Sequence, residues 1–201
     1  MEKHTLIKVT AVVTENKVGT HYFKSEEMQY PLYLTGYMGS GKSTFGRLLA
    51  RELDCGFIDL DKYIEEQEKM SISEIFARYG EEKFREVERQ AVHESTNFGK
   101  TVIATGGGVP CHFDNMEIMN RYGFTIYLKV SPPALADRLL PGREHRPLIA
   151  GKNKEELLEF ITRSLKQRAP WYEKSTLTAD TTGLSPEASV RIVLETLRLE
   201  H

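Results

Sequence analysis

The segment from Gly36 to Thr44 reads GYMGSGKST and constrains the fold of this chain more than any other feature. It fits the phosphate-loop template Gly-x-x-x-x-Gly-Lys-[Ser/Thr], whose backbone N–H groups surround an anion. An apolar run over 30–34 precedes the motif, and apolar residues recur at helical spacing after it. A glycine-rich turn before a surface helix would leave Lys42 and Ser43 unexplained. We therefore predict nucleoside-triphosphate binding by Gly39, Ser40, Gly41, Lys42, Ser43 and Thr44.

Within this loop, Lys42 is placed to reach the outer phosphates, and the Ser43 hydroxyl is placed to ligate Mg²⁺.

The formal net charge of −2 shows no basic excess, which argues against nucleic acid as the main partner. Cys55 and Cys111 are isolated and fit neither a metal site nor a disulfide framework. No apolar stretch approaches the ~18 residues of a membrane span, and no secretory signal is evident. We expect a cytoplasmic enzyme without a membrane partner.

Strand and helix patterns alternate along most of the chain, which predicts a parallel sheet covered by helices on both faces. The expected strands are 31–35, 56–59, 101–105, 124–130 and 175–179. The expected helices are 42–53, 61–69, 72–79, 81–97, 112–121, 132–139, 153–168 and 185–199. These elements form a three-layer α/β/α sandwich with a five-stranded parallel sheet. We assign residues 30–201 to a single domain, with a mobile lid at about 140–152.

The two ends of the chain carry weaker signals. Residues 1–29 alternate weakly and form a leader of unknown role. A hairpin, a flexible leader and non-native sequence before a true start at Met28 are all compatible with this segment. The last three residues can likewise be the beginning of a cloning scar.

Two acids follow the second expected strand. Asp59 and Asp61 lie two residues apart, which in an extended chain places both carboxylates on the same side. The carboxyl ends of parallel strands form the ligand crevice, where such acids can hold Mg²⁺ or accept a proton from a hydroxyl. An alternative makes Asp61 only the N-cap of the next helix.

A charged pair lies on the buried side of the helix after Gly80. Glu88 falls four residues after Phe84 on the apolar stripe, and Arg85 lies at the margin of that stripe. An inward Arg held by a Glu is suited to binding a substrate carboxylate, and the alternative is an ordinary solvated ion pair on the surface. Arg168 falls three residues beyond Leu165, in line with its own helix's apolar residues, before Pro170 ends that helix.

Together, Arg85 and Arg168 would form a clamp for a carboxylate. The alternative for Arg168 is a cation placed against a helix C-terminus. The expected strand at 101–105 runs into Gly106, Gly107 and Gly108, which offer bare N–H groups to an oxygen-rich small molecule. A mere sharp turn is the alternative reading of this triplet.

The chain resembles the shikimate kinase family of P-loop kinases over roughly residues 31 to 183. The resemblance depends on six motifs that occur in the family's order. They are GYMGSGKST at 36–44, DLD at 59–61, GEEKFREVE at 80–88, ATGGG at 104–108, RPL at 146–148 and RAPWY at 168–172.

This resemblance implies transfer of the ATP γ-phosphoryl group to the 3-hydroxyl of shikimate, on the route to chorismate and the aromatic amino acids. It implies Mg²⁺ with Ser43 and Asp59 on the metal side, Asp61 as proton acceptor, and Lys42 on the phosphates. Arg146 on the lid would neutralise charge on the transferring group. Shikimate would be bound by Asp61, Arg85, Glu88, Gly106, Gly107, Gly108 and Arg168.

The chain departs from the family's pattern in one loop. Residues 180–186 lack the Arg that many relatives carry near adenine, and Arg138 is our candidate to cover the base instead. A gluconate-type sugar-acid kinase and a nucleotide-binding regulatory module without turnover are the alternative functions. The family resemblance implies a monomer.

Overall fold

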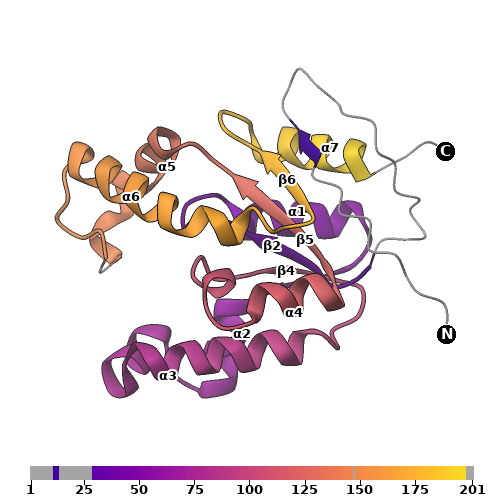
Figure 1. Ribbon diagram of the computed structural model, residues 1–201, viewed down its shortest axis with the longest axis horizontal. Helices are drawn as coiled ribbons and strands as arrows, with labels where there is room; N and C mark the ends of the chain where they lie inside the picture. Colours follow the sequence, from indigo (N-terminus) through magenta and orange to yellow (C-terminus); the bar gives the residue numbers. More distant parts are fainter. Residues whose placement is uncertain (1–10, 14–28, 147, 198–201) are drawn as a thin grey trace.

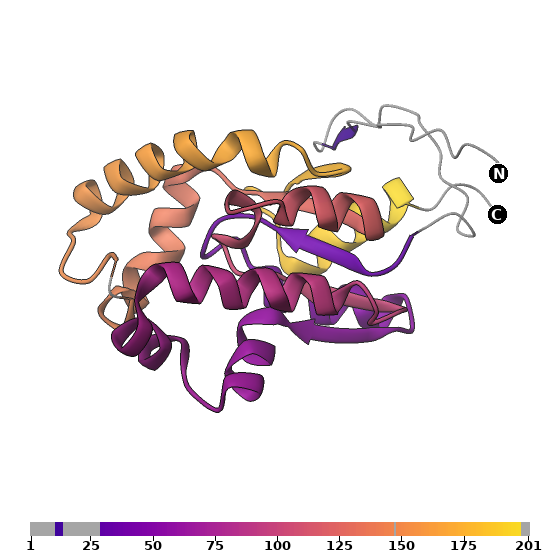
Figure 2. The ribbon, with the colours of Figure 1, turned by 60° about the horizontal axis from the view of Figure 1, so that its bottom comes forward.

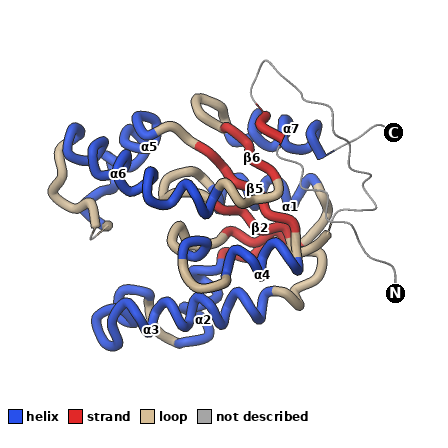
Figure 3. The backbone as a smooth tube through the Cα atoms, viewed as in Figure 1, coloured by secondary structure: helices blue, strands red, loops and turns tan. Residues whose placement is uncertain are grey.

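The computed structural model describes residues 11–13, 29–146 and 148–197, apart from the side chains of 11–13 and of residue 145. Its centre is a parallel sheet with the strand order β1-β6-β5-β2-β4-β3, and helices cover both faces of this sheet (Figures 1 and 3). The strands are β1 Ala11–Val13, β2 Leu32–Thr35, β3 Gly56–Asp59, β4 Thr101–Ala104, β5 Phe124–Lys129 and β6 Leu177–Asp180.

The five predicted strands are all present, and the short strand β1 adds a sixth at the edge. β1 runs parallel to β6, with Val12 opposite Thr178, so residues 11–13 do not form a hairpin with β6. The interpretations of residues 1–10 and 14–28, and of the last three residues, lie outside the described residues.

Seven α-helices and two short 3₁₀ helices connect the strands among the described residues. The α-helices are α1 Lys42–Glu52, α2 Leu60–Glu68, α3 Ile72–Ser95, α4 Asn115–Tyr122, α5 Pro132–Leu139, α6 Lys154–Tyr172 and α7 Pro186–Leu197. The 3₁₀ helices are η2 Val109–Cys111 and η3 Leu140–His145. None of the helices in the described part of the chain has the length and apolar character needed to cross a membrane.

Alternation along β2 divides the core between the two faces of the sheet. Leu32 and Leu34 pack in a buried cluster with residues of α1 and α7. Tyr33 points to the opposite face and packs with residues of α2, α3 and α4. A third cluster joins α5 to α6 and includes Tyr37 from the loop after β2. Figure 2 shows α5 and α6 together at one end of the molecule.

Helix α3 contains a sharp break that matches the two predicted helices 72–79 and 81–97. Gly80 has φ 79° and ψ 177°, a conformation accessible essentially to glycine. The first half of α3 begins with a capping box formed by Ser71 and Glu74. The break redirects the chain just before Arg85, so it sets the direction from which that side chain enters the site.

The predicted end of the helix at 153–168 is wrong, because α6 continues through Pro170 to Tyr172. A proline removes one hydrogen bond to the carbonyl four residues earlier. That carbonyl belongs to Lys166, an exposed residue, where water can replace the lost donor. A hydrogen bond to another segment also stabilises the last turn of α6, because the buried Tyr172 hydroxyl donates to the Gly107 carbonyl at 2.6 Å.

Candidate active site

The phosphate loop connects β2 to α1 as the sequence predicts. Gly41 occupies the N-cap position of α1 with φ 92°, a left-handed conformation that favours glycine. The α1 N-terminus has no side-chain cap, so its first N–H groups remain available to an anion. The Lys42 ammonium donates to the carbonyls of Gly36 at 2.8 Å and Tyr37 at 3.0 Å. Lysine and amides therefore converge on one anion-binding loop.

A pocket of about 260 Å³ lies beside this loop. It is bounded by the loop, by Arg138 of α5 and by the segment that contains Leu184 and Pro186. The Arg138 guanidinium lies 3.4 Å from the carbonyl oxygens of Gly39 and Ser40. The pocket has the position and the mixed polar and apolar lining that the nucleoside part of a nucleotide needs.

Ser43 and Asp59 meet at the mouth of the phosphate loop. The Ser43 hydroxyl donates to the Asp59 carboxylate at 2.6 Å. Mg²⁺ prefers oxygen ligands and is usually held by one or two carboxylates together with substrate phosphates. These two residues fit that requirement, whereas the described residues contain no group of three or more His, Cys, Asp or Glu side chains that could hold a metal by themselves.

Asp61 lies in the first turn of α2, so the expectation of an extended chain from Asp59 to Asp61 is wrong. The N-cap position belongs to Asp59, and the alternative role of Asp61 as the N-cap is also wrong. A Cβ atom on Gly106 would lie 2.7 Å from Asp61 Oδ1, so this carboxylate packs directly against the glycine. Burial raises the pKa of Asp61, and the nearby charge of Asp59 raises it further.

Arg85 and Glu88 form the inward ion pair predicted from the helical register. Arg85 Nη1 donates to Glu88 Oε2 at 2.7 Å, and their side chains are 15% and 2% exposed. Burial raises the pKa of Glu88 to about 7 although Arg85 acts in the opposite direction. A Cβ atom on Gly108 would lie 2.6 Å from Arg85 Nη1, and one on Gly106 would lie 3.2 Å from Glu88 Oε1. The glycine triplet therefore forms the surface on which this pair rests.

Arg168 approaches the same region from α6. Its guanidinium lies over the ring of Tyr37, 5.4 Å from the ring centroid, next to the phosphate loop. Burial lowers the pKa of Lys42 to about 8, and the positive charge of Arg168 acts in the same direction. The charge of Arg168 therefore acts on Lys42 in the phosphate loop, which agrees with the predicted inward position of Arg168 on its helix.

The contacts of the Arg146 side chain in the described part of the chain lie within the predicted lid. This side chain is exposed, and its Nη1 donates to the Gly142 carbonyl at 3.0 Å within the predicted lid. Its role at the transferring phosphoryl group stays a prediction.

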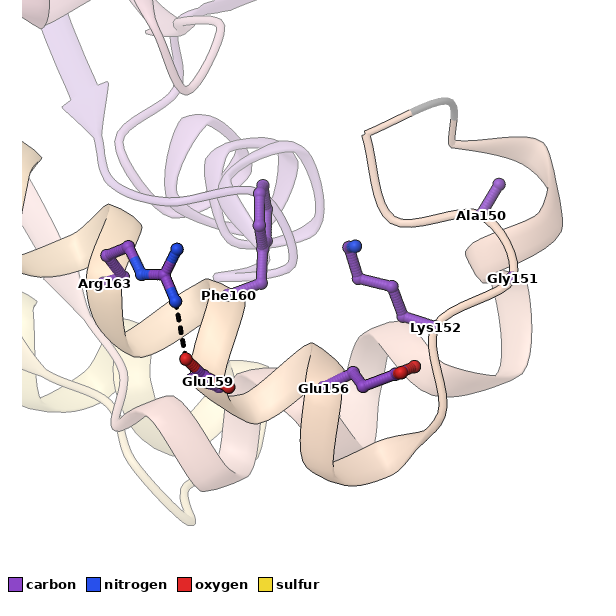
Figure 4. A pocket seen from close by; sticks show the side chains of 7 residues that line it. All are labelled: Ala150, Gly151, Lys152, Glu156, Glu159, Phe160 and Arg163. Atoms are coloured by element: carbon purple, nitrogen blue, oxygen red, sulfur yellow. Dashed lines mark hydrogen bonds and ion pairs between the residues drawn. The ribbon is translucent and has the colours of Figure 1, made fainter.

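A separate pocket lies between the end of the predicted lid and α6. Figure 4 shows this pocket, of about 390 Å³, where the end of the lid meets α6. Within it, the Lys152 ammonium lies 5.4 Å from the centroid of the Phe160 ring. The lining contains no residue of the phosphate loop or of the glycine triplet.

Two contacts of the site were not predicted from the sequence. Glu81 accepts hydrogen bonds from Arg85 Nε at 3.2 Å and Nη2 at 2.9 Å. The i,i+4 spacing of Glu81 and Arg85 is a visible signal, but it is common on helix surfaces. The bond from Tyr172 to Gly107 joins residues far apart in the chain and has no local signal.

Comparison with known proteins agrees with this geometry. The family model described as Shikimate kinase matches residues 38–198. A shikimate kinase of Bacteroides fragilis is 46% identical over 167 residues, covering 83% of this chain and 93% of that protein. The crystal structure of a shikimate kinase from Bacteroides thetaiotaomicron has a TM-score of 0.77 at 44% identity, covering 84% of this chain and 98% of that one.

A third similar protein is a shikimate kinase from Acinetobacter baumannii, solved in complex with shikimate. Its TM-score is 0.75 at 33% identity, covering 85% of this chain and 93% of that one. The family match spans well over half of the chain and agrees with the relatives and the solved structures. The chain therefore belongs to the shikimate kinase family.

Proposed function

We propose that this protein transfers the γ-phosphoryl group of ATP to the 3-hydroxyl of shikimate. The observation that carries this proposal is that the glycine triplet lies between the phosphate loop on one side and Asp61 and Arg85 on the other. A Cβ atom on Gly107 would lie 3.2 Å from the Met38 amide nitrogen in the phosphate loop. Gly106 and Gly108, its neighbours, contact Asp61 and Arg85. A small acid lying on this triplet would therefore face the phosphates.

On the nucleotide side, Lys42 and the amides of residues 39–44 hold the phosphates, and Arg138 borders the pocket for the base. Ser43 and Asp59 would hold Mg²⁺, which when bound neutralises charge on the β- and γ-phosphates. Phosphoryl transfer depends mainly on positioning and charge stabilisation, and this set of groups serves both.

On the acceptor side, Asp61 accepts the proton of the attacking hydroxyl. Its raised pKa brings it closer to the operating pH, which suits a general base. Arg85, braced by Glu88, and Arg168 bind the acceptor carboxylate, while the glycine triplet lines the ring. Arg146 completes the charge stabilisation when the lid closes over the site and excludes water.

A coupled assay for ADP release tests the reaction with Mg²⁺-ATP and shikimate, gluconate or no acceptor. We expect turnover with shikimate alone. Turnover with gluconate would reject the acceptor assignment, and ATP binding without turnover would favour a regulatory module.

The carboxylate clamp has its own test. Arg85→Ala should raise the KM for shikimate and leave the KM for ATP nearly unchanged, because Arg85 lies at the glycine triplet and does not line the nucleotide pocket. Arg89→Ala is the matched control, since Arg89 is an exposed arginine of the same helix that pairs with Asp114. Equal changes in both KM values for Arg85→Ala would reject the clamp.

A further inference from the structure

We infer that Glu81 competes with the carboxylate of the acceptor for one edge of the Arg85 guanidinium, and so sets both affinity and selectivity for acidic acceptors. This inference rests on the proposed function, because it assumes that the substrate carboxylate binds Arg85. Neither the helical register nor the family motifs assign a role to Glu81.

The geometry shows an arginine whose side edge is already filled. A guanidinium binds a carboxylate best through a pair of parallel N–H groups along one edge. In Arg85 the edge formed by Nε and Nη2 donates both of its bonds to Glu81 Oε1, at 3.2 Å and 2.9 Å. Nη1 donates to Glu88 Oε2 at 2.7 Å. A substrate carboxylate can take the side edge only after Glu81 leaves it.

The two glutamates differ in how easily they can leave. The Glu88 side chain is 2% exposed and its other oxygen faces Gly106, so its departure would strand a buried arginine. The Glu81 side chain is 63% exposed and begins the second half of α3 just after the break at Gly80. Water can solvate Glu81 as soon as it turns away. Glu88 is therefore the permanent brace, and Glu81 is the exchangeable partner.

The exchange discriminates between classes of acceptor. A ligand that brings its own carboxylate replaces Glu81 and restores the pairing of Arg85. A neutral polyol offers no anion for this edge and leaves Glu81 in place. Glu81 therefore imposes a cost on acidic acceptors and none on neutral ones, so it narrows the difference in affinity between the two classes.

The test compares three variants in steady-state kinetics and in calorimetric titration with shikimate. Glu81→Gln removes the competing charge, and Glu81→Asp keeps the charge but shortens the side chain. Glu82→Gln is the control, because Glu82 is an exposed neighbour whose side chain has no hydrogen-bond or ion-pair partner in the described part of the chain. An exposed pair of this kind contributes little, so we expect the KM for shikimate to fall about two- to fivefold in both Glu81 variants.

The KM for ATP serves as an internal reference and should not move, and Glu82→Gln should behave like the wild type. An unchanged or raised KM for shikimate in Glu81→Gln would overturn the inference, and a raised value would show that Glu81 orients Arg85. An equal fall in Glu82→Gln would also overturn it, because only overall charge would then matter. A wild-type protein that neither binds nor phosphorylates shikimate would reject the proposed function and this inference together.

Discussion

Gly106→Ala is expected to damage catalysis far more than a small core substitution usually does. The new Cβ would lie 2.7 Å from Asp61 Oδ1, whereas ordinary contacts begin at 3.4 Å, so the carboxylate must retreat by about 0.7 Å. The same Cβ would also lie 3.2 Å from Glu88 Oε1, and Arg85 holds the Glu88 side chain in place through its other oxygen, so little space is left for Gly106 to shift. The backbone of Gly106 does not require glycine, so the effect comes from lost space.

A misplacement of about 1 Å at a reacting group can lower a rate about 100-fold. We therefore expect kcat to fall about 10- to 100-fold in Gly106→Ala, measured by ADP release at saturating ATP and shikimate. Gly56→Ala is the control, because its Cβ would have one tight contact, with Thr101 Oγ1 at 3.2 Å, at the end of β3 that lies away from Asp59. A kcat within twofold of the wild type for Gly106→Ala would refute the reasoning, even if thermal stability fell.

Two further substitutions test separate parts of the site. Asp61→Asn should lower kcat by at least ~100-fold if Asp61 is the base, and an unchanged kcat in the ADP-release assay would assign proton removal to another group. Gly80→Ala should lower the free energy of unfolding by about 1–3 kcal/mol in urea denaturation, because alanine is strained at φ 79° although no atom lies within 4 Å of its Cβ. Wild-type stability for Gly80→Ala would show that α3 can straighten without cost.

The parts of the site that depend on local pattern could be predicted from the sequence. The phosphate loop follows from fixed spacing, and the inward positions of Arg85 and Glu88 follow from the 3.6-residue period of their helix. The structure confirms both, since the buried Glu88 contacts Arg85 at 2.7 Å. Arg168 lies on the predicted side of α6 for the same reason.

The remaining features depend on contacts between distant segments. Pro170 favours a helix end by local rules, but Tyr172 is held by Gly107, and this bond keeps the last turn of α6 in place. The edge strand β1 is set by pairing with β6, which a weak alternation over three residues could not reveal. Tertiary hydrogen bonds override local preference in both cases.

The ionisation of Glu88 gives a prediction about stability and pH. Its pKa is about 7 in the folded protein and 4.5 as an ordinary value, because burial outweighs the attraction of Arg85. Between about pH 4.5 and pH 7, Glu88 therefore keeps a proton in the folded state that it has lost in the unfolded state. The stabilisation linked to Glu88 is therefore complete below about pH 4.5 and disappears as the pH rises through about 7.

A shift of about 2.5 pH units corresponds to about 3 kcal/mol, most of which falls between pH 5 and pH 8. Urea denaturation across that range should show the wild type losing about 2–3 kcal/mol relative to Glu88→Gln, which cannot titrate at this position. Comparing the two proteins at each pH removes the titration of every other group. Parallel stability curves would contradict the argument, because they would mean that the attraction of Arg85 at 2.7 Å keeps Glu88 ionised in spite of its burial.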